Sequence, residues 1–128
     1  MNYLTTEQIL FLHARLIKET GGVHGVRDLR ILLSALGRSQ AVFEGQDLYP
    51  DIFSKAAALM DSMIRNHPFI DGNKRTGLAA AGLFLMHNGF RFSASNSELE
   101  ILAVKVARSE IMVEEIANWL RNHSLPKE

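Results

Sequence analysis

The segment from residue 67 to residue 76 concentrates the side chains of this chain that can do chemistry. It reads His-Pro-Phe-Ile-Asp-Gly-Asn-Lys-Arg-Thr. His67 is of the residue type best suited to accept a proton near neutral pH, as a general base does. Asp71 offers the hard carboxylate oxygens that Mg²⁺ prefers when it bridges phosphates. A base and a carboxylate in one short segment predict chemistry on a phosphorylated ligand such as a nucleotide.

The other polar residues of the segment suit the binding of a phosphate group. Gly72 permits a tight turn and a close approach of the backbone to an anion. Asn73 opens a predicted helix, whose free N–H groups point to the same place. Lys74 and Arg75 add positive charge, and an arginine can hold a phosphate through two parallel hydrogen bonds. Taken singly, each residue also has an ordinary use in a turn, a helix cap or a solvated helix end. Two adjacent cations oppose the helix dipole in a first turn, however, and this favours a bound anion.

Helical periodicity dominates the elements that must position this segment. Apolar residues recur at helical spacing in six stretches, at about residues 5–20, 28–37, 51–67, 73–87, 96–108 and 112–122. Thr5 and Gln8 are typical of a capping box at the start of the first stretch. Within the fourth stretch, residues 78–86 are apolar nearly all round, as in a helix buried in the middle of a bundle. We expect an all-α fold, a compact bundle of about six helices with a buried central helix.

Finer expectations follow from the same pattern. Four leucines of the second predicted helix are expected to face the core, namely Leu29, Leu32, Leu33 and Leu36. Phe69 and Ile70 are expected to point into the core and to hold the polar segment rigid. Since Pro68 disfavours a helical backbone at the preceding residue, the third helix should end at His67.

The connections between the helices carry weaker signals. Residues 38–50 have no helical period, contain Gly45 and end at Pro50, so we expect a loop or a short hairpin. Residues 90–92 alternate between apolar and polar and predict a short extended piece. The last four residues are expected to fray.

Composition excludes several classes of function. The chain has 128 residues, enough for one domain that covers residues 1–128. Lys plus Arg is 14 and Asp plus Glu is 14, which argues against a protein that binds nucleic acid through bulk charge. The absence of cysteine excludes thiol catalysis, and the other histidines lack a metal-binding spacing. No signal peptide or membrane-spanning stretch is recognisable, so we expect a cytoplasmic protein without direct contact with membrane.

The segment 67–76 closely resembles the signature of the Fic/Doc superfamily, H-x-F-x-[D/E]-[G/A]-N-[G/K]-R. Flanking residues resemble the death-on-curing (Doc) branch of that superfamily; they are residues 21–25, 32–36, 49–51 and 88–89. The resemblance extends from about Leu4 to about Leu120. It implies a compact all-α fold, in agreement with the helix pattern.

The resemblance also implies a reaction. Fic proteins that transfer AMP carry a glycine where this chain has Lys74, and an arginine where it has Leu78. Both departures resemble the Doc branch, whose members transfer the γ-phosphate of ATP to a protein hydroxyl. Their known target is a threonine of elongation factor Tu, and the result is an arrest of translation. Doc proteins are toxins, and a small antitoxin with a flexible C-terminal segment neutralises them.

Roles for individual residues follow from the resemblance. His67 corresponds to the general base and Asp71 to the Mg²⁺ ligand. The nucleotide phosphates are expected to contact four residues of the segment, Gly72, Asn73, Lys74 and Arg75. Arg65 resembles a further basic position near the phosphates. The region that corresponds to residues 38–50 is expected to lie beside the active site and to align the target peptide, or else to pack onto the bundle.

Two other functions stay open. The first is AMP transfer of the Fic type, against which Lys74 and Leu78 argue. The second is a catalytically inactive module that binds the antitoxin. The inhibitory pattern [S/T]-x-x-x-E-[G/N] of many Fic proteins does not occur in the chain, so we expect any inhibition to come from another protein.

Overall fold

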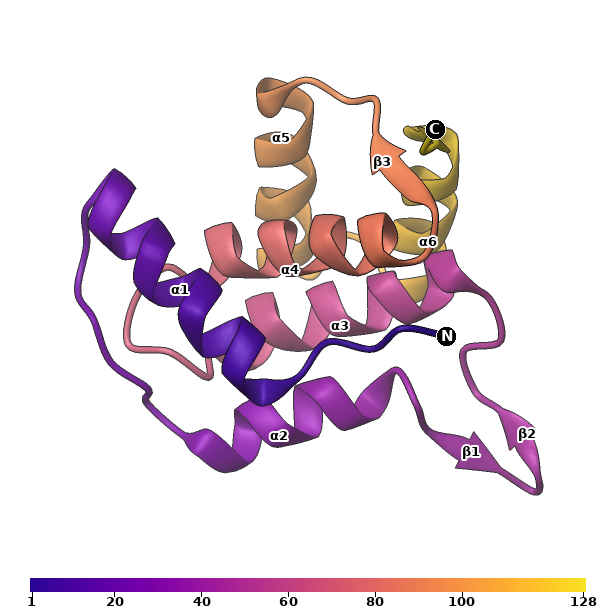
Figure 1. Ribbon diagram of the computed structural model, residues 1–128, viewed down its shortest axis with the longest axis horizontal. Helices are drawn as coiled ribbons and strands as arrows, with labels where there is room; N and C mark the ends of the chain where they lie inside the picture. The colour runs from indigo at the N-terminus through magenta and orange to yellow at the C-terminus, as the bar shows by residue number, and fades with distance from the viewer.

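Six helices pack around one another in the computed structural model, which describes residues 1–128 (Figure 1). The helices are α1 (Thr6–Thr20), α2 (Leu29–Arg38), α3 (Ile52–Asn66), α4 (Asn73–His87), α5 (Asn96–Ala107) and α6 (Val113–Asn122). Four short strands complete the chain: β1 (Val42–Phe43), β2 (Gln46–Asp47), β3 (Phe90–Phe92) and β4 (Ser124–Pro126). The predicted all-α bundle of about six helices is therefore confirmed.

Helices α3 and α4 lie side by side in the middle of the bundle (Figure 1). Helix α3 packs against α2, α4 and α6, and every residue from Lys55 to Ile64 is buried. Three successive alanines allow the neighbouring helices to approach α3 closely. Helix α4 contacts α1, α3 and α5 but leaves part of its apolar surface open, with Met86 45% exposed. The expected buried centre is thus present, and α3 contributes its longest buried run.

Helix boundaries follow the local signals in the sequence. The Thr5 hydroxyl accepts a hydrogen bond from the Gln8 N–H (3.2 Å), and the Gln8 side chain accepts one from the Thr5 N–H (2.8 Å). This capping box starts α1 as predicted. Helix α2 ends one residue later than expected, at Arg38. Helix α3 ends at Asn66 because His67, which precedes Pro68, leaves the right-handed helical region.

The predicted core face of α2 is partly wrong. Leu32 is fully buried, but Leu29 and Leu33 are 50% and 49% exposed. Helix α2 packs mainly on α3 and meets it with Leu32 and Ala35, which lie three residues apart on one face. Leu33, one residue after Leu32, therefore lies on a different side of the helix and faces solvent.

Strands β1 and β2 form the short hairpin expected between α2 and α3. The buried ammonium group of Lys55 lies 2.9 Å from the Ser39 carbonyl oxygen and 3.5 Å from the Asp47 carboxylate, and so holds the base of the hairpin. Figure 1 shows the hairpin at the start of α3, whereas residues 67–72 follow the opposite end of this helix. The expectation that this region lies beside residues 67–76 is therefore wrong.

The last residues of the chain do not fray, contrary to expectation. Strand β4 pairs with β3 in antiparallel register, with Arg91 opposite Leu125. The Lys127 ammonium group then donates to the Met86 carbonyl oxygen at 2.9 Å. The extended piece at residues 90–92 was predicted, but its partner lies more than thirty positions away and carries a proline, which is tolerated because β4 is an edge strand.

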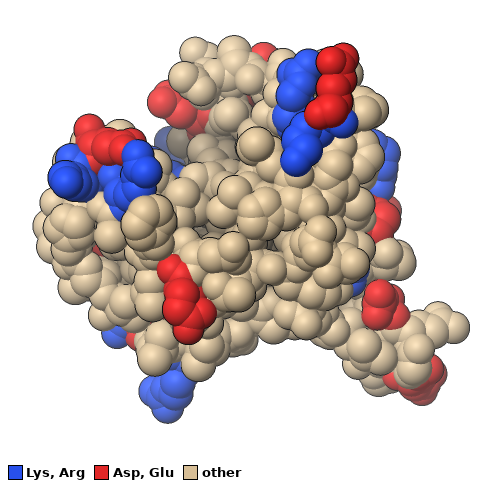
Figure 2. All heavy atoms as spheres, in the orientation of Figure 1, with Lys and Arg blue, Asp and Glu red and all other residues tan.

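The surface carries no dominant charge. On the face seen in Figure 2, acidic and basic side chains form small separate groups on a largely uncharged surface. This agrees with the formal net charge of zero. None of the six helices combines the length and the apolar character that a membrane span requires.

Candidate functional site

The polar segment forms the loop that joins α3 to α4, residues 67–72, and the first turn of α4 (Figure 1). His67 begins this loop and is exposed to solvent, with φ 51° and ψ 65°. Phe69 lies in the core and is 1% exposed, as predicted, whereas Ile70 is 56% exposed. The prediction for Ile70 is wrong: Phe69 pairs with Val26 in an antiparallel bridge, and in such a bridge the side chain of the next residue points to the opposite side.

Asn73 braces the loop from within. Its side-chain carbonyl accepts a hydrogen bond from the Phe69 N–H at 3.0 Å, and its amide group donates to the Phe69 carbonyl at 2.9 Å. The same amide nitrogen lies 3.4 Å from Nδ1 of His67. The side chain of Asn73 therefore fixes the loop, and its backbone N–H is the group that can face a ligand.

The N-terminus of α4 has no side-chain cap. Its N-cap residue is Gly72, with φ 79°. The first N–H groups of a helix have no partner within the helix, and here no side chain replaces one. These groups and the exposed Lys74 make this end of α4 a site that favours an anion.

Asp71 is held as an ionised carboxylate beside that helix end. Its Oδ2 accepts a hydrogen bond from the Val23 N–H at 3.0 Å, and its Oδ1 accepts one from the Gly72 N–H at 2.8 Å. These two bonds, in that order, together with the nearby charge of Arg75, lower the pKa of Asp71 below its ordinary value. The carboxylate is thus charged at neutral pH and keeps lone pairs for a further contact.

The site offers a metal ion one carboxylate ligand, that of Asp71. No group of three or more His, Cys, Asp or Glu side chains in the structure is arranged to hold a metal. Asp71 alone fits Mg²⁺, which is commonly bound by one or two carboxylates together with substrate phosphates and water. It does not fit an ion that needs a complete set of protein ligands.

Arg75 is anchored by the end of α1. Its Nη1 donates to the Thr20 hydroxyl and, at 2.8 Å, to the Gly21 carbonyl oxygen. Its Nη2 lies 3.9 Å from the Asp71 carboxylate. These contacts orient the guanidinium at the first turn of α4.

Arg65 is not joined to the loop by any contact. Its Nη1 lies 3.6 Å from Oδ1 of Asp61, a buried carboxylate that also receives a hydrogen bond from Arg38 at 2.7 Å. The structure thus brings six of the seven predicted residues together, in the loop and in the first turn of α4. Arg65 instead lies one turn from Asp61 on α3 and pairs with it.

The comparisons with known proteins agree with this geometry. Residues 3–85, which include α1 to α4, match the model of the Fic/DOC family. The chain belongs to the Fic/DOC family. It is 43% identical over 97 residues to the protein named Toxin Doc of Mycolicibacterium smegmatis, covering 76% of this chain and 68% of that protein. It is 36% identical over 121 residues to Protein kinase doc of Escherichia phage P1, covering 94% of each chain. The resemblance to the Doc branch is thereby confirmed.

Residues 22–28 lie beside the Fic/DOC motif. Residues 21–25 resemble the Doc branch in sequence, but no contact between them and the motif was predicted. Val26 forms an antiparallel bridge with Phe69, and the Ile70 N–H donates to the Gly25 carbonyl at 3.1 Å. The N–H groups of Arg27 and Asp28 both donate to the Pro68 carbonyl oxygen, at 2.8 and 3.0 Å. The three glycines at positions 21, 22 and 25 were the available signal, because clustered glycines indicate a close approach of backbones.

His13 is a second residue that sequence reasoning missed. It is 3% exposed, its ring stacks on that of Phe69 with centroids 3.8 Å apart, and its Nε2 lies 2.8 Å from the Asp71 carbonyl oxygen. A buried histidine in an amphipathic helix carries no local sign of such a partner. The contact with His13 fixes the backbone of Asp71, whose side chain supplies the carboxylate of the site.

A groove of about 850 Å³ adjoins the Fic/DOC motif between α1, α4 and the start of α5. Arg75 and Thr20 lie at its lining, and most of the other lining residues are apolar, among them Leu12, Leu16, Leu78, Leu83, Met86 and Phe92. This groove is where α4 leaves its apolar surface open.

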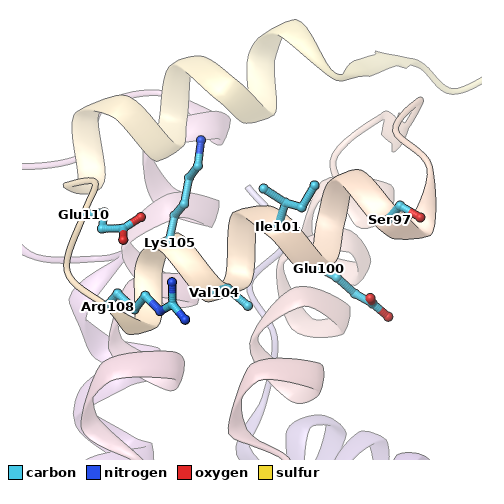
Figure 3. Close-up of a pocket in the computed structure, with 7 residues that line it drawn as sticks. All are labelled: Ser97, Glu100, Ile101, Val104, Lys105, Arg108 and Glu110. Carbon is cyan, nitrogen blue, oxygen red and sulfur yellow. The ribbon is translucent and has the colours of Figure 1, made fainter.

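A second depression, of about 430 Å³, lies on α5 and the turn after it (Figure 3). Figure 3 shows Lys105 and Ile101 directed toward α6, and Glu100 directed away from it. No residue of the motif and no histidine lines this depression. The groups that can do chemistry are therefore those of the α3–α4 loop.

Proposed function

We propose that this Fic/DOC protein is a toxin of a toxin–antitoxin pair and transfers the γ-phosphate of ATP to a hydroxyl group of a protein. The observation that carries the proposal is the arrangement of the α3–α4 loop. An exposed histidine begins it, and an ionised carboxylate lies beside an uncapped helix end that bears two cations. The relatives named Toxin Doc and Protein kinase doc support the toxin and kinase parts of the proposal.

In the proposed reaction, His67 accepts the proton of the target hydroxyl as its oxygen attacks the γ-phosphorus. The bond between that phosphorus and the β–γ bridging oxygen breaks, and ADP leaves. Bound Mg²⁺ supplies charge neutralisation on the phosphates, and Asp71 is the residue that would hold it. The backbone of Gly72 and Asn73 and the side chains of Lys74 and Arg75 hold the phosphates.

Arg65 remains a proposed phosphate contact at the edge of the site. One third of its side chain is exposed, at 34%, and Asp61 neutralises part of its charge. To reach a phosphate, Arg65 would have to move away from Asp61. We therefore propose for it a smaller share of phosphate binding than for Lys74 and Arg75.

The proposed target hydroxyl is a threonine of elongation factor Tu, as the resemblance to the Doc branch implies. A target segment that presents its hydroxyl to His67 must lie beside residues 22–28, since this segment borders the loop. The hairpin β1–β2 is a poor candidate for this role, because it lies at the far end of α3 (Figure 1). This target would place the protein in the cytoplasm, acting as one domain of residues 1–128.

The proposed antitoxin is a small protein whose flexible C-terminal segment folds on this chain. The groove between α1, α4 and α5 suits an amphipathic segment, because it is long and largely apolar and carries polar groups at its edges. Its volume and its closeness to Arg75 support inhibition by another chain. Neither nucleic acid nor membrane enters the proposed mechanism.

The test uses ATP labelled in two positions. Purified protein is incubated with Mg²⁺, elongation factor Tu and ATP that carries the label on either the γ- or the α-phosphate. We expect γ-label, and no α-label, on the target. The α-label alone on a protein would instead favour AMP transfer, an alternative that Lys74 and Leu78 disfavour. No label on elongation factor Tu or on any lysate protein would refute the enzyme proposal.

The variant His67→Ala separates catalysis from binding. We expect it to lose transfer by a factor of about 10² to 10⁴, because a general base contributes about this much. His24→Ala is the matched control, since His24 is also exposed and lies in the adjacent segment. If His67→Ala kept its toxicity in cells, the protein would act as an antitoxin-binding module without catalysis.

A further inference from the structure

His67 is held in a backbone conformation that it would not adopt freely. Its φ of 51° and ψ of 65° lie in the left-handed region, which residues with a side chain rarely occupy. Pro68 restricts it further, because a residue before proline prefers an extended backbone. Such a conformation persists only where the surroundings impose it.

Arg27 supplies the contacts that impose it. Its Nε donates to the His67 carbonyl oxygen at 2.6 Å, and its Nη2 donates to the Asn66 carbonyl oxygen at 2.7 Å. Its backbone N–H donates to the Pro68 carbonyl oxygen at 2.8 Å. The strained residue His67 and its two neighbours, Asn66 and Pro68, therefore all accept hydrogen bonds from Arg27 through their carbonyl groups.

The position of Arg27 also suits the end of α3. The last carbonyl groups of a helix lack partners within it and carry a partial negative charge. A guanidinium can bind two of them at once because its N–H groups are fixed in a planar fork. Lysine has its three donors on one nitrogen, so it lacks the two separate nitrogens with which Arg27 binds these carbonyl groups.

The phosphate end of the loop depends on other residues. His13 contacts the Asp71 carbonyl oxygen, and Thr20 anchors Arg75. Both come from α1, and Arg27 forms no hydrogen bond or ion pair with Asp71 or Arg75. Residues of α1 thus hold the phosphate end of the loop, and Arg27 holds the backbone at His67.

We propose that Arg27 is a positioning residue for His67, which holds the proposed base in line with the target hydroxyl without contacting substrate. The inference rests on the proposed function, in which His67 is the base. Removal of Arg27 should therefore change the rate of transfer and leave ATP binding intact. A merely stabilising role would instead lower the melting temperature and leave kcat of the folded protein unchanged.

The kinetic test compares Arg27→Gln and Arg27→Lys with Arg30→Gln. Arg30 is a matched control, because its side chain is 92% exposed and its one contact is a 3.7 Å pair with Asp28. We expect Arg27→Gln to lower kcat by about 10- to 100-fold, the size of effect that small misplacements of a reacting group produce. Arg27→Lys should lose less, and KM for ATP should stay within about twofold of the wild-type value in both. Arg30→Gln should retain the wild-type kcat.

Three results would overturn the proposal. The first is a kcat of Arg27→Gln within about twofold of wild type. The second is a raised KM for ATP at constant kcat in Arg27→Gln, and the third is a loss of activity in Arg30→Gln as large as that in Arg27→Gln. If Arg27→Gln does not fold, Arg27→Lys decides in its place, since it keeps the charge and removes the planar fork that binds the two carbonyl groups.

A second measurement does not need activity. In NMR spectra without nucleotide, Arg27→Gln should shift the imidazole signals of His67 and the amide signals next to it. The amide signals of Gly72 and Arg75 should stay in place, because α1 holds that end of the loop. Absence of a shift at His67 would refute the role of Arg27 whatever the enzyme does. Absence of label transfer by the wild-type protein would refute the proposed function, while the shifts would still report on Arg27.

Discussion

Replacement of Gly22 by alanine tests whether the segment beside the loop sets the position of Asp71. Gly22 has φ 124°, and a Cβ atom there would lie 2.5 Å from Oδ2 of Asp71 and 3.1 Å from Nη2 of Arg75. Gly21 has φ 87°, and a Cβ atom there would meet nothing within 4 Å. The two substitutions therefore share an unfavourable backbone conformation, but only Gly22→Ala brings a Cβ atom too close to Asp71 and Arg75.

The expected magnitudes differ for stability and for binding. Holding alanine at these positive φ values costs about 1–3 kcal/mol in either variant. For a chain of this size, this corresponds to a melting temperature lower by roughly 4–12 °C. In Gly22→Ala the Asp71 carboxylate must also move, because real Cβ contacts essentially never fall under 3.0 Å. A shift of several tenths of an ångström in a metal ligand should weaken Mg²⁺·ATP binding by about 10- to 100-fold, as disturbed supports of metal ligands do.

The assay is calorimetric titration of Mg²⁺·ATP into the wild-type protein and both variants, alongside thermal unfolding. We expect similar melting temperatures for the two variants and weaker binding in Gly22→Ala alone. The amide signal of Val23 should shift in the same variant, since its hydrogen bond ends on the displaced oxygen. Equal Mg²⁺·ATP affinity in Gly22→Ala and Gly21→Ala would refute the reasoning, because the contact with Asp71 would then have no effect.

Three further predictions concern the same loop. Thr20→Val should raise KM for ATP several-fold, because Arg75 loses the hydroxyl group to which it donates. Thr20→Ser keeps a hydroxyl group and should have the KM of the wild-type protein. Equal KM values for Thr20→Val and the wild-type protein would contradict this. His13→Phe keeps a ring beside the loop but removes a buried hydrogen bond. We therefore expect the free energy of unfolding, measured by thermal unfolding, to fall by about 1–2 kcal/mol. An unchanged melting temperature would contradict this. The lowered pKa of Asp71 means that its contact with Val23 stabilises the fold above the ordinary pKa of 3.8, and is lost only as pH falls through the lowered value. The Val23 amide signal should therefore titrate below pH 3.8, and a midpoint at or above 3.8 would contradict this.

Local signals in the sequence were sufficient to predict the elements around the site. Thr5 begins α1 as predicted, and Asp28 and Asp51 begin the helices expected at residues 28–37 and 51–67. Each of the three side chains accepts a hydrogen bond from the first turn. Pro68 predicted the end of α3 because its effect acts on the neighbouring residue. These signals work because cause and effect lie within one helical turn. The reaction and the roles of its residues, in contrast, were predicted from the resemblance to the Doc branch. The transfer of label from ATP is the experiment that tests them.

The supports of the loop were not predictable in the same way. The contact between His13 and Asp71 spans 58 positions, and the contact between Arg27 and His67 spans 40. Neither leaves a trace in the local pattern, because an apolar stripe gives the face of a helix and not the partner of one polar residue on it. The local pattern likewise predicted the hairpin but not its place, which was expected from the resemblance. The location of the hairpin depends on how α2 packs on α3.

The residues of the site itself are locally unfavourable choices, and one of these choices, the adjacent cations Lys74 and Arg75, was visible in the sequence. His67 adopts a left-handed backbone before a proline, α4 begins without a side-chain cap, and its first turn carries two cations. Each choice costs free energy when judged from its neighbours in sequence. Each cost is offset by a group from the stretch of chain that ends α1 and leads to α2, or by the anion that we propose. A local conflict thus marks where function lies, whereas the compensating residues, Arg27 and Thr20 among them, become visible only in the folded chain.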